Sequence, residues 1–343
     1  MCKTKRSKLS CFFQYNLLQL GVQISSAPNR EHLNVPFKSL LTASCAIIAA
    51  ALLTACGAST PDDPIAAALA SKGAGEPAVW TLRDDDTTLH IMGTIHLLKP
   101  NLDWRTDAIN DALNAADTIV FEADVDSQKA AAEMMKFISR KGMFTDGRQL
   151  TDTLTEAEQA QLNNALETLN LPLGAIQTMR PWFAAINLAV LQVQKGGYDP
   201  ESGVERVLQA VAQADNKDFK YLETVDEQLI RLASLPDKDQ VAFLVSSIED
   251  MEEGTKMLDV LVDEWVDGDI NGLAILLSNP DIIGSESVYD ALLKDRNQDW
   301  TPKIIDMLET PGTRLIAVGA GHLAGDDSVI NMLRKEGYTV TGP

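Results

Sequence analysis

Cysteine is confined to the first 56 residues of this 343-residue chain, at Cys2, Cys11, Cys45 and Cys56. No disulfide can form beyond Cys56, so the rest of the chain must draw its stability from a hydrophobic core. The same absence excludes thiol catalysis by any later residue. A hydrophobic content of 45% with 23% charged residues is typical of a soluble globular protein.

Several common catalytic motifs are also absent. The chain has no His-Glu-x-x-His helix, no Gly-x-Ser-x-Gly elbow, no P-loop and no Gly-x-Gly-x-x-Gly turn. Basic residues are few, and the net charge is −20. Without residues 1–55 the chain keeps 23 basic and 48 acidic residues, a charge near −25. We therefore expect no nucleic-acid partner, and contact with anionic lipid surfaces only through a lipid.

Histidine is scarce, and two of the four histidines share one local pattern. Gly93-Thr-Ile-His96 and Gly319-Ala-Gly-His322 each follow an apolar, strand-like stretch. His90 lies inside the first of these stretches, so we interpret it as a sheet-packing residue. Chemistry in open α/β sheets gathers at the carboxyl ends of strands. His96 and His322 are therefore the first candidates for functional residues.

The region around Cys56 has the features of a secretory signal. Lys38 precedes an apolar run over 39–53, which is too short for a permanent membrane span. Leu53-Thr-Ala-Cys56 resembles the lipobox of bacterial lipoproteins, in which the cysteine is lipidated. Gly57, in place of Asp, favours the outer membrane, with the protein facing the periplasm. The alternative is an ordinary secretory signal with a chance cysteine.

These features predict three segments. Residues 1–55 are a signal region, in which 1–37 form an unusual prefix; translation starting near Val35 is one explanation. Residues 56–75, rich in Pro, Ala, Ser and Gly, are expected to form a flexible tether. Residues 76–343 are expected to fold as a single domain.

The pattern after residue 76 predicts an α/β fold. Residues 78–83 and 87–95 read as a β-hairpin, and strands are expected at 117–124, 219–224, 314–318 and 338–340. Strand, helix, strand order favours parallel neighbours. Residues 127–278 show mainly helical periodicity, and helices at 287–294 and 300–308 are expected to flank Arg296-Asn297. We predict a central mixed, mostly parallel sheet with flanking helices and a large inserted helical region.

Four polar residues fall at predicted strand ends: His96, Glu122, Glu223 and His322. Imidazole and carboxylate suit zinc, manganese, cobalt or iron, and either group can act as a general base. The alternatives are satisfied structural histidines and, for Glu122, a cap on the following helix. Three glycines permit turns or a close approach of ligand, so they are grouped with Glu223 as candidate substrate-binding residues: Gly93, Gly319 and Gly321.

The motif set resembles the TraB/GumN family across nearly all of residues 76–343. The matching features are the two Gly-x-x-His motifs, Phe121-Glu122, Arg180-Pro-Trp-Phe, Glu223-Thr224, Arg296-Asn297 and the Gly-Ala-Gly-His-Leu-Ala-Gly end. That family includes bacterial lipoproteins and the Tiki proteins, described as divalent-metal-dependent proteases. Its wider fold is similar to erythromycin-esterase and ChaN-like proteins. One departure is Gly203-Val204-Glu205, where many relatives have Asp in the last position, so we rank Glu205 below Glu122.

The resemblance implies a membrane-tethered, metal-dependent hydrolase, most simply a peptidase. His96, Glu122 and His322 would bind a divalent ion (manganese, cobalt or zinc) or act as base, and Arg296 and Asn297 would stabilise an oxyanion. The expected partner is a peptide or another small substrate. Two alternatives remain: a non-enzymatic protein that sequesters a peptide, and an esterase-like hydrolase that needs no metal because a motif histidine is the base.

Overall fold

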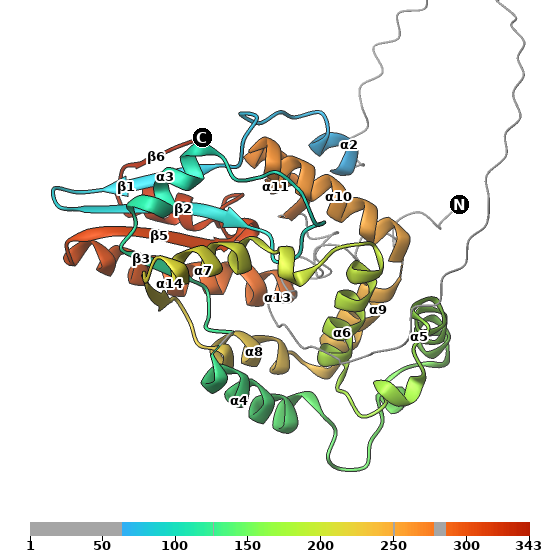
Figure 1. The fold of residues 1–343 in the computed structure, drawn as a ribbon. Helices are drawn as coiled ribbons and strands as arrows, with labels where there is room; N and C mark the ends of the chain where they lie inside the picture. The colour runs from blue at the N-terminus through green and yellow to red at the C-terminus, as the bar shows by residue number, and fades with distance from the viewer. Residues whose placement is uncertain (1–63, 126, 250, 278–285) are drawn as a thin grey trace, which may run out of the picture.

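The computed structural model describes residues 64–125, 127–249, 251–277 and 286–343 (Figure 1). The predicted signal region, Cys56 and the first part of the predicted tether lie outside these residues. None of the described helices is long and apolar enough to cross a membrane.

A six-stranded sheet with the order β4-β3-β5-β2-β1-β6 organises the fold. Neighbours among β4, β3, β5 and β2 run parallel, whereas β1 is antiparallel to β2 and to β6. The mixed, mostly parallel sheet predicted from the sequence is confirmed. The strands are β1 (Val79–Arg83), β2 (Thr87–Thr94), β3 (Thr118–Phe121), β4 (Asp218–Tyr221), β5 (Gly312–Gly319) and β6 (Val340–Thr341).

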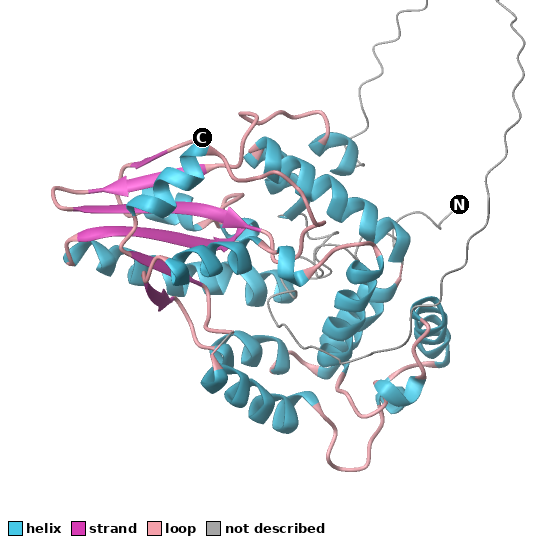
Figure 2. Cartoon of the chain, viewed as in Figure 1, coloured by secondary structure: helices cyan, strands magenta, loops and turns pink. Residues whose placement is uncertain are grey.

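Helices cover both faces of the sheet (Figures 1 and 2). The central strand β5 carries buried apolar side chains on both faces, so each face needs such a cover. Leu315 and Ala317 belong to a core shared with α3 (Asp107–Ala115) and α7 (Val204–Ala214). Ile316 and Val318 face the opposite way, into a core with α14 (Asp295–Asp306) and α15 (Val329–Lys335). This alternation follows the two-residue period of a strand, and burial on both faces is characteristic of parallel sheets.

The inserted helical region lies beside the carboxyl ends of the parallel strands (Figure 1). In it, α6 and α9 pack side by side, and α10 leads through a sharp corner into α11. Its helices are α4 (Gln128–Phe137), α5 (Glu156–Leu169), α6 (Pro181–Lys195), α8 (Val225–Ala233), α9 (Asp237–Ile248), α10 (Met251–Asp267) and α11 (Ile270–Leu277).

Helical structure continues through Arg296 and Asn297 instead of breaking there. α13 (Glu286–Tyr289), a π-helical turn (Asp290–Lys294) and α14 follow one another without a gap. The predicted separation into two helices was wrong. The stretch from 295 to 299 is polar, so apolar periodicity fades, but it contains no residue that breaks a helix. Both residues therefore sit in the first turn of α14, and both are buried.

The described part of the predicted tether is packed against the domain. α2 (Pro64–Ala68) lies against α11, and Ala68 is completely buried. Hydrogen bonds join residues 71–75 to the α10–α11 corner. From Pro64 onward the chain is thus docked in this structure.

Candidate functional site

The four strand-end residues meet at the carboxyl edge of the sheet, as predicted. His96 follows β2, Glu122 follows β3, Glu223 follows β4, and His322 closes a short 3-10 turn after β5. The four strands are adjacent and parallel, so their ends reach the same edge. All four side chains are buried, with His96 and Glu223 at 7% exposure and His322 at 0%.

Arg296 occupies the centre of this group. Its Nη2 donates to Glu122 Oε2 and to Glu223 Oε1, each at 2.5 Å, and its Nε donates to Glu223 Oε1 at 3.0 Å. The side chain is 2% exposed. Burial disfavours its charge, but Glu223 and Glu122 outweigh burial and raise its pKa. One buried guanidinium therefore compensates two buried carboxylates.

His322 is held as a neutral imidazole by two neighbours. Its Nε2 lies 3.1 Å from Arg296 Nη1, which can only donate, and its Nδ1 lies 2.6 Å from Asn297 Oδ1. Asn297 Nδ2 donates to the carbonyl of Asp327, which fixes the amide orientation. His322 must therefore carry its proton on Nδ1. Burial, followed by the charge of Arg296, lowers its pKa well below the ordinary value.

His96 contacts a carboxylate, whereas His322 contacts a guanidinium. Its Nδ1 lies 2.5 Å from Glu205 Oε1, and Thr94 donates its hydroxyl to the same oxygen. Burial opposes protonation of His96, but the charge and hydrogen bond of Glu205, together with Glu122, outweigh it and raise the pKa. The pKa of Glu205 is lowered: burial opposes ionisation, but the charge and hydrogen bond of His96 prevail.

The start of α7 brings Glu205 to His96. The N–H of Val204 donates to the carbonyl of Ile95 at 3.0 Å, and a Cβ on Gly203 would lie 2.1 Å from the carbonyl oxygen of His96. Only glycine permits this approach. The contact between Glu205 and His96 was not predicted, because sequence spacing gives no information about which helix start meets the β2 end.

Glu122 contacts Arg296 through one carboxylate oxygen and lies near Gly319 and His322 through the other. Its Oε1 accepts from the N–H of Gly319 at 2.6 Å and lies 3.7 Å from His322 Nε2. A Cβ on Gly319 would lie 3.1 Å from Glu122 Oε1 and 3.5 Å from His96 Nε2. Glycine therefore keeps the space between these two groups clear of a side chain. The interpretation of Glu122 as a simple helix cap is not supported by these contacts.

Glu223 is a structural partner of Arg296 in this structure. Its Oε2 accepts from the indole N–H of Trp300 at 3.2 Å, and burial, with the charge of Glu122, raises its pKa against the opposing effect of Arg296. Trp300 also packs its ring 4.3 Å from the ring of His322. Trp300 was not among the residues predicted from the sequence; it lies four residues after Arg296 on α14, so both side chains are on the same face of the helix.

The candidate glycines Gly93 and Gly321 also lie at this edge, whereas His90 and Arg180 contact other residues. Gly93 is in β2, where a Cβ would lie 3.0 Å from Ala320, and Gly321 is buried in the turn that ends at His322. His90 lies away from the group and shares a 3.2 Å hydrogen bond with Thr81. Arg180 begins α6, and its guanidinium lies over the ring of Phe144.

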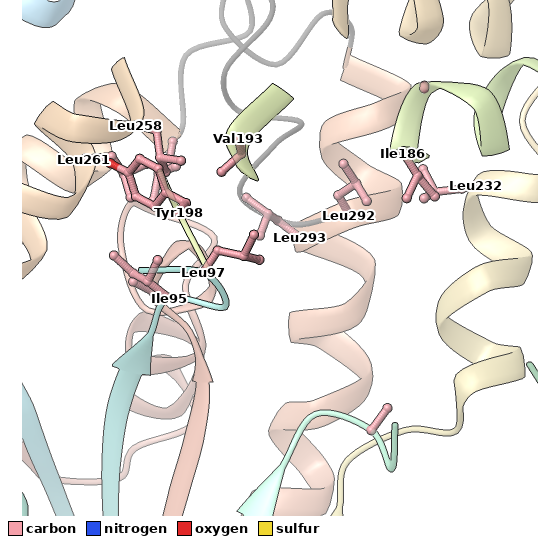
Figure 3. Close-up of a cluster of buried hydrophobic side chains, with 14 of the residues drawn as sticks. Ile95, Leu97, Ile186, Val193, Tyr198, Leu232, Leu258, Leu261, Leu292 and Leu293 are labelled. Atoms are coloured by element: carbon pink, nitrogen blue, oxygen red, sulfur yellow. The ribbon is translucent and has the colours of Figure 1, made fainter. Parts of the chain in front are cut away.

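An apolar cluster supports the loop that carries His96. Figure 3 shows Ile95 and Leu97, the neighbours of His96 in sequence, beside Tyr198 and Leu261. Leu293, from the π-helical turn before α14, lies close to Leu97 in the same view. Close packing of this kind fixes the position of the loop and keeps the surroundings of the site low in dielectric constant.

The arrangement does not fit a divalent ion between Glu122 and His322. Arg296 donates to Glu122 and lies at hydrogen-bond distance from His322 Nε2, so a metal there would face a buried guanidinium. Within the described ranges, no group of three or more His, Cys, Asp or Glu side chains is arranged to hold a metal ion. A divalent cofactor stays a prediction from family resemblance.

Fold and site together define an α/β protein with a buried histidine–carboxylate–arginine cluster at the carboxyl edge of its sheet. The chain belongs to the TraB/PrgY/gumN family, whose model matches residues 78–342. It is 26% identical over 258 residues to the uncharacterized protein YbaP of Escherichia coli (strain K12), covering 75% of this chain and 92% of that protein. An uncharacterized protein of Treponema pallidum (strain Nichols) is 20% identical over 271 residues, covering 76% of this chain and 81% of that protein. No solved structure matches the chain.

Proposed function

We propose that this protein is a hydrolase in which His96, oriented by Glu205, is the general base that activates water, without a resident metal. The observation that carries the proposal is the 2.5 Å contact between His96 Nδ1 and Glu205 Oε1. A carboxylate on Nδ1 fixes the tautomer with a basic Nε2 and stabilises the imidazolium formed when that nitrogen takes a proton.

Of the two motif histidines, His96 is the better base. His322 has no exposed surface, and its Nε2 faces Arg296. His96 retains some exposure, and the side chain of Glu205 is 21% exposed, so water can approach this pair. Gly319 leaves the side of His96 Nε2 without a side chain, since a Cβ there would lie 3.5 Å from this nitrogen.

The proposed reaction is hydrolysis of an ester or amide. His96 Nε2 removes a proton from water, the hydroxide attacks the carbonyl carbon, and the carbonyl oxygen becomes an oxyanion. Arg296 is close enough to depress protonation of His96, and its positive charge would stabilise that oxyanion. His96 Nε2–H then donates its proton to the leaving group as the bond to carbon breaks.

The test is hydrolysis by the full chain after EDTA treatment, measured on panels of aryl esters and of peptides. His96→Gln should reduce turnover by roughly 100-fold or more, the usual contribution of a general base. His90→Gln is the matched control, because His90 lies outside the cluster, and it should leave turnover unchanged.

Two results would contradict the proposal. Activity that disappears with EDTA and returns with manganese, cobalt or zinc would establish the metal-dependent mechanism instead. Peptide binding without turnover under any of these conditions would establish a sequestering protein.

A further inference from the structure

A second group of buried acids lies outside the candidate site, at the corner between α10 and α11. Glu264 is 6% exposed and Asp269 is 1% exposed, and both carboxyl groups lie against Gly272 of α11. Asp269 Oδ1 also accepts from the N–H of Gly272 at 2.9 Å. Two buried carboxyl groups this close repel each other when both are ionised, whereas a proton on one of them lets it donate to the other.

The same corner binds the start of the described chain, residues 64–76, called here the docked segment. Ser71 Oγ donates to Asp269 Oδ2 at 2.5 Å. The N–H groups of Gly73 and Gly75 donate to the side chain and the carbonyl of Asp267, each at 2.8 Å. Asp269 therefore belongs both to the acid pair and to the contact surface of the docked segment.

Backbone contacts show that this surface is closely fitted. A Cβ on Gly73 would lie 2.0 Å from the carbonyl oxygen of Asp267. A Cβ on Gly268 would lie 2.1 Å from the carbonyl oxygen of Glu76. On α11, a Cβ on Gly272 would lie 2.6 Å from Glu264 Oε2. With so little free space, ionisation of Glu264 cannot be relieved by a small shift of its carboxyl group.

We propose that the Glu264–Asp269 pair makes docking of residues 64–76 depend on pH, holding the segment in acid and weakening its attachment as Glu264 ionises. Protonated Glu264 donates to Asp269 and leaves a single negative charge to accept from Ser71 and Gly272. Ionised Glu264 places two negative charges side by side in a buried corner.

The surrounding charges support this direction. Burial, followed by the charge and hydrogen bond of Asp269, raises the pKa of Glu264 to about 7, and Asp267 and Asp263 on α10 act in the same sense. α2 and α11 contain no charged residue, and the docked segment contributes only Lys72 and Glu76, both exposed. A carboxyl whose folded pKa is raised favours docking below its ordinary value of 4.5, and that contribution is lost as pH rises toward 7.

The experiment is hydrogen–deuterium exchange of the full chain between pH 5 and pH 8, corrected for intrinsic exchange. We expect protection of the Gly73 and Gly75 amides to fall by roughly tenfold or more over this range. Glu264→Gln keeps a donor to Asp269 without a titrating group, so its protection should stay high at pH 8. Glu76→Gln, an exposed carboxyl of the docked segment, is the control and should follow the wild type.

Ser71→Ala gives an independent check, because it removes the hydroxyl that contacts Asp269 and the carbonyl of Ala68 without changing any titrating group. It should lower protection of the docked segment at pH 5 while β2 and β5 amides stay protected. Wild-type protection that does not change with pH, or the same pH dependence in Glu264→Gln, would overturn the proposal.

Discussion

His96 and His322 show how one sequence pattern leads to two electrostatic environments. Each follows Gly-x-x at the end of a strand, yet His96 contacts a carboxylate and His322 contacts a guanidinium. The carboxylate raises the pKa of His96, whereas burial and Arg296 lower that of His322. Opposite shifts in paired titratable groups are the usual basis for dividing roles in an active site.

The raised pKa of His96 predicts the acid limb of the pH–rate profile. The base must be neutral, so kcat/KM should rise with pH and reach half its maximum above 6.5, the ordinary histidine value. Glu205→Gln removes the charge that favours the imidazolium, so the limb should move to lower pH and the maximum rate should fall. An unshifted limb in Glu205→Gln would show that another group is the base.

The same pair contributes to stability within a defined pH window. The contribution of His96, whose pKa is raised, is complete below 6.5 and is lost as pH rises through the folded value. The contribution of Glu205, whose pKa is lowered, is present above 4.5 and is lost as pH falls through the folded value. The pair should therefore stabilise the fold most between about pH 4.5 and 6.5.

At the scale of elements, Arg296 attaches α14 to the ends of β3 and β4. Its guanidinium bonds Glu122 and Glu223, which follow these two strands, and Trp300 adds a second bond from the same helix. A buried ion pair of this kind adds little to the free energy of unfolding compared with an apolar core. Removing one partner lowers the free energy of unfolding strongly, because the remaining buried charges are then uncompensated.

Arg296→Met should therefore lower the free energy of unfolding by about 3–5 kcal/mol near pH 7, measured by urea denaturation. The loss should become smaller in acid, because the raised pKa of Glu223 lets this carboxyl take up a proton there. Arg231→Met is the control: this half-buried arginine pairs with the exposed side chains of Asp299 and Asp295, so its removal should cost about 1 kcal/mol. Equal decreases in the free energy of unfolding for the two variants would contradict the role of Arg296 as a buried ion-pair partner of Glu122 and Glu223.

At the scale of the whole molecule, an acidic domain carries its candidate site at one sheet edge and a docked N-terminal segment at a neighbouring corner. Trp265, next to Glu264 on α10, donates its indole N–H to the carbonyl of Gly93 at 3.0 Å. Gly93 begins the motif that ends in His96, so one helix contacts both regions. The predicted lipid attachment at Cys56 would place the docked segment directly between anchor and domain.

The lipid anchor itself is testable in bacteria. Metabolic labelling with a fatty-acid analogue should label the wild-type protein and direct it to the membrane fraction. Cys56→Ala should remove both label and membrane association, whereas Cys45→Ala, inside the apolar run, should keep them. Label retained in Cys56→Ala would refute the lipobox prediction.

Much of the fold could be predicted because its signals are local. Apolar runs ending in glycine located β2 and β5, and strand–helix–strand order predicted parallel strands, which the sheet confirms, although β5 lies between β2 and β3. The helix boundary near Arg296 was missed because polar residues there conceal the period of a helix that packing against the sheet stabilises. The predicted strand ends also brought the four candidate residues to one edge, which needs only topology.

The sequence by itself determined which strand-end groups reach the carboxyl edge: two histidines and two glutamates, with no cysteine. Only the tertiary structure decided how they pair, because hydrogen-bond partners come from elements far apart in the chain. Glu205 reaches His96 from 109 residues away in α7, and Arg296 enters between Glu122 and Glu223 from α14. Those pairings set the opposite pKa directions of the two motif histidines, since charge and burial act through space and not along the sequence.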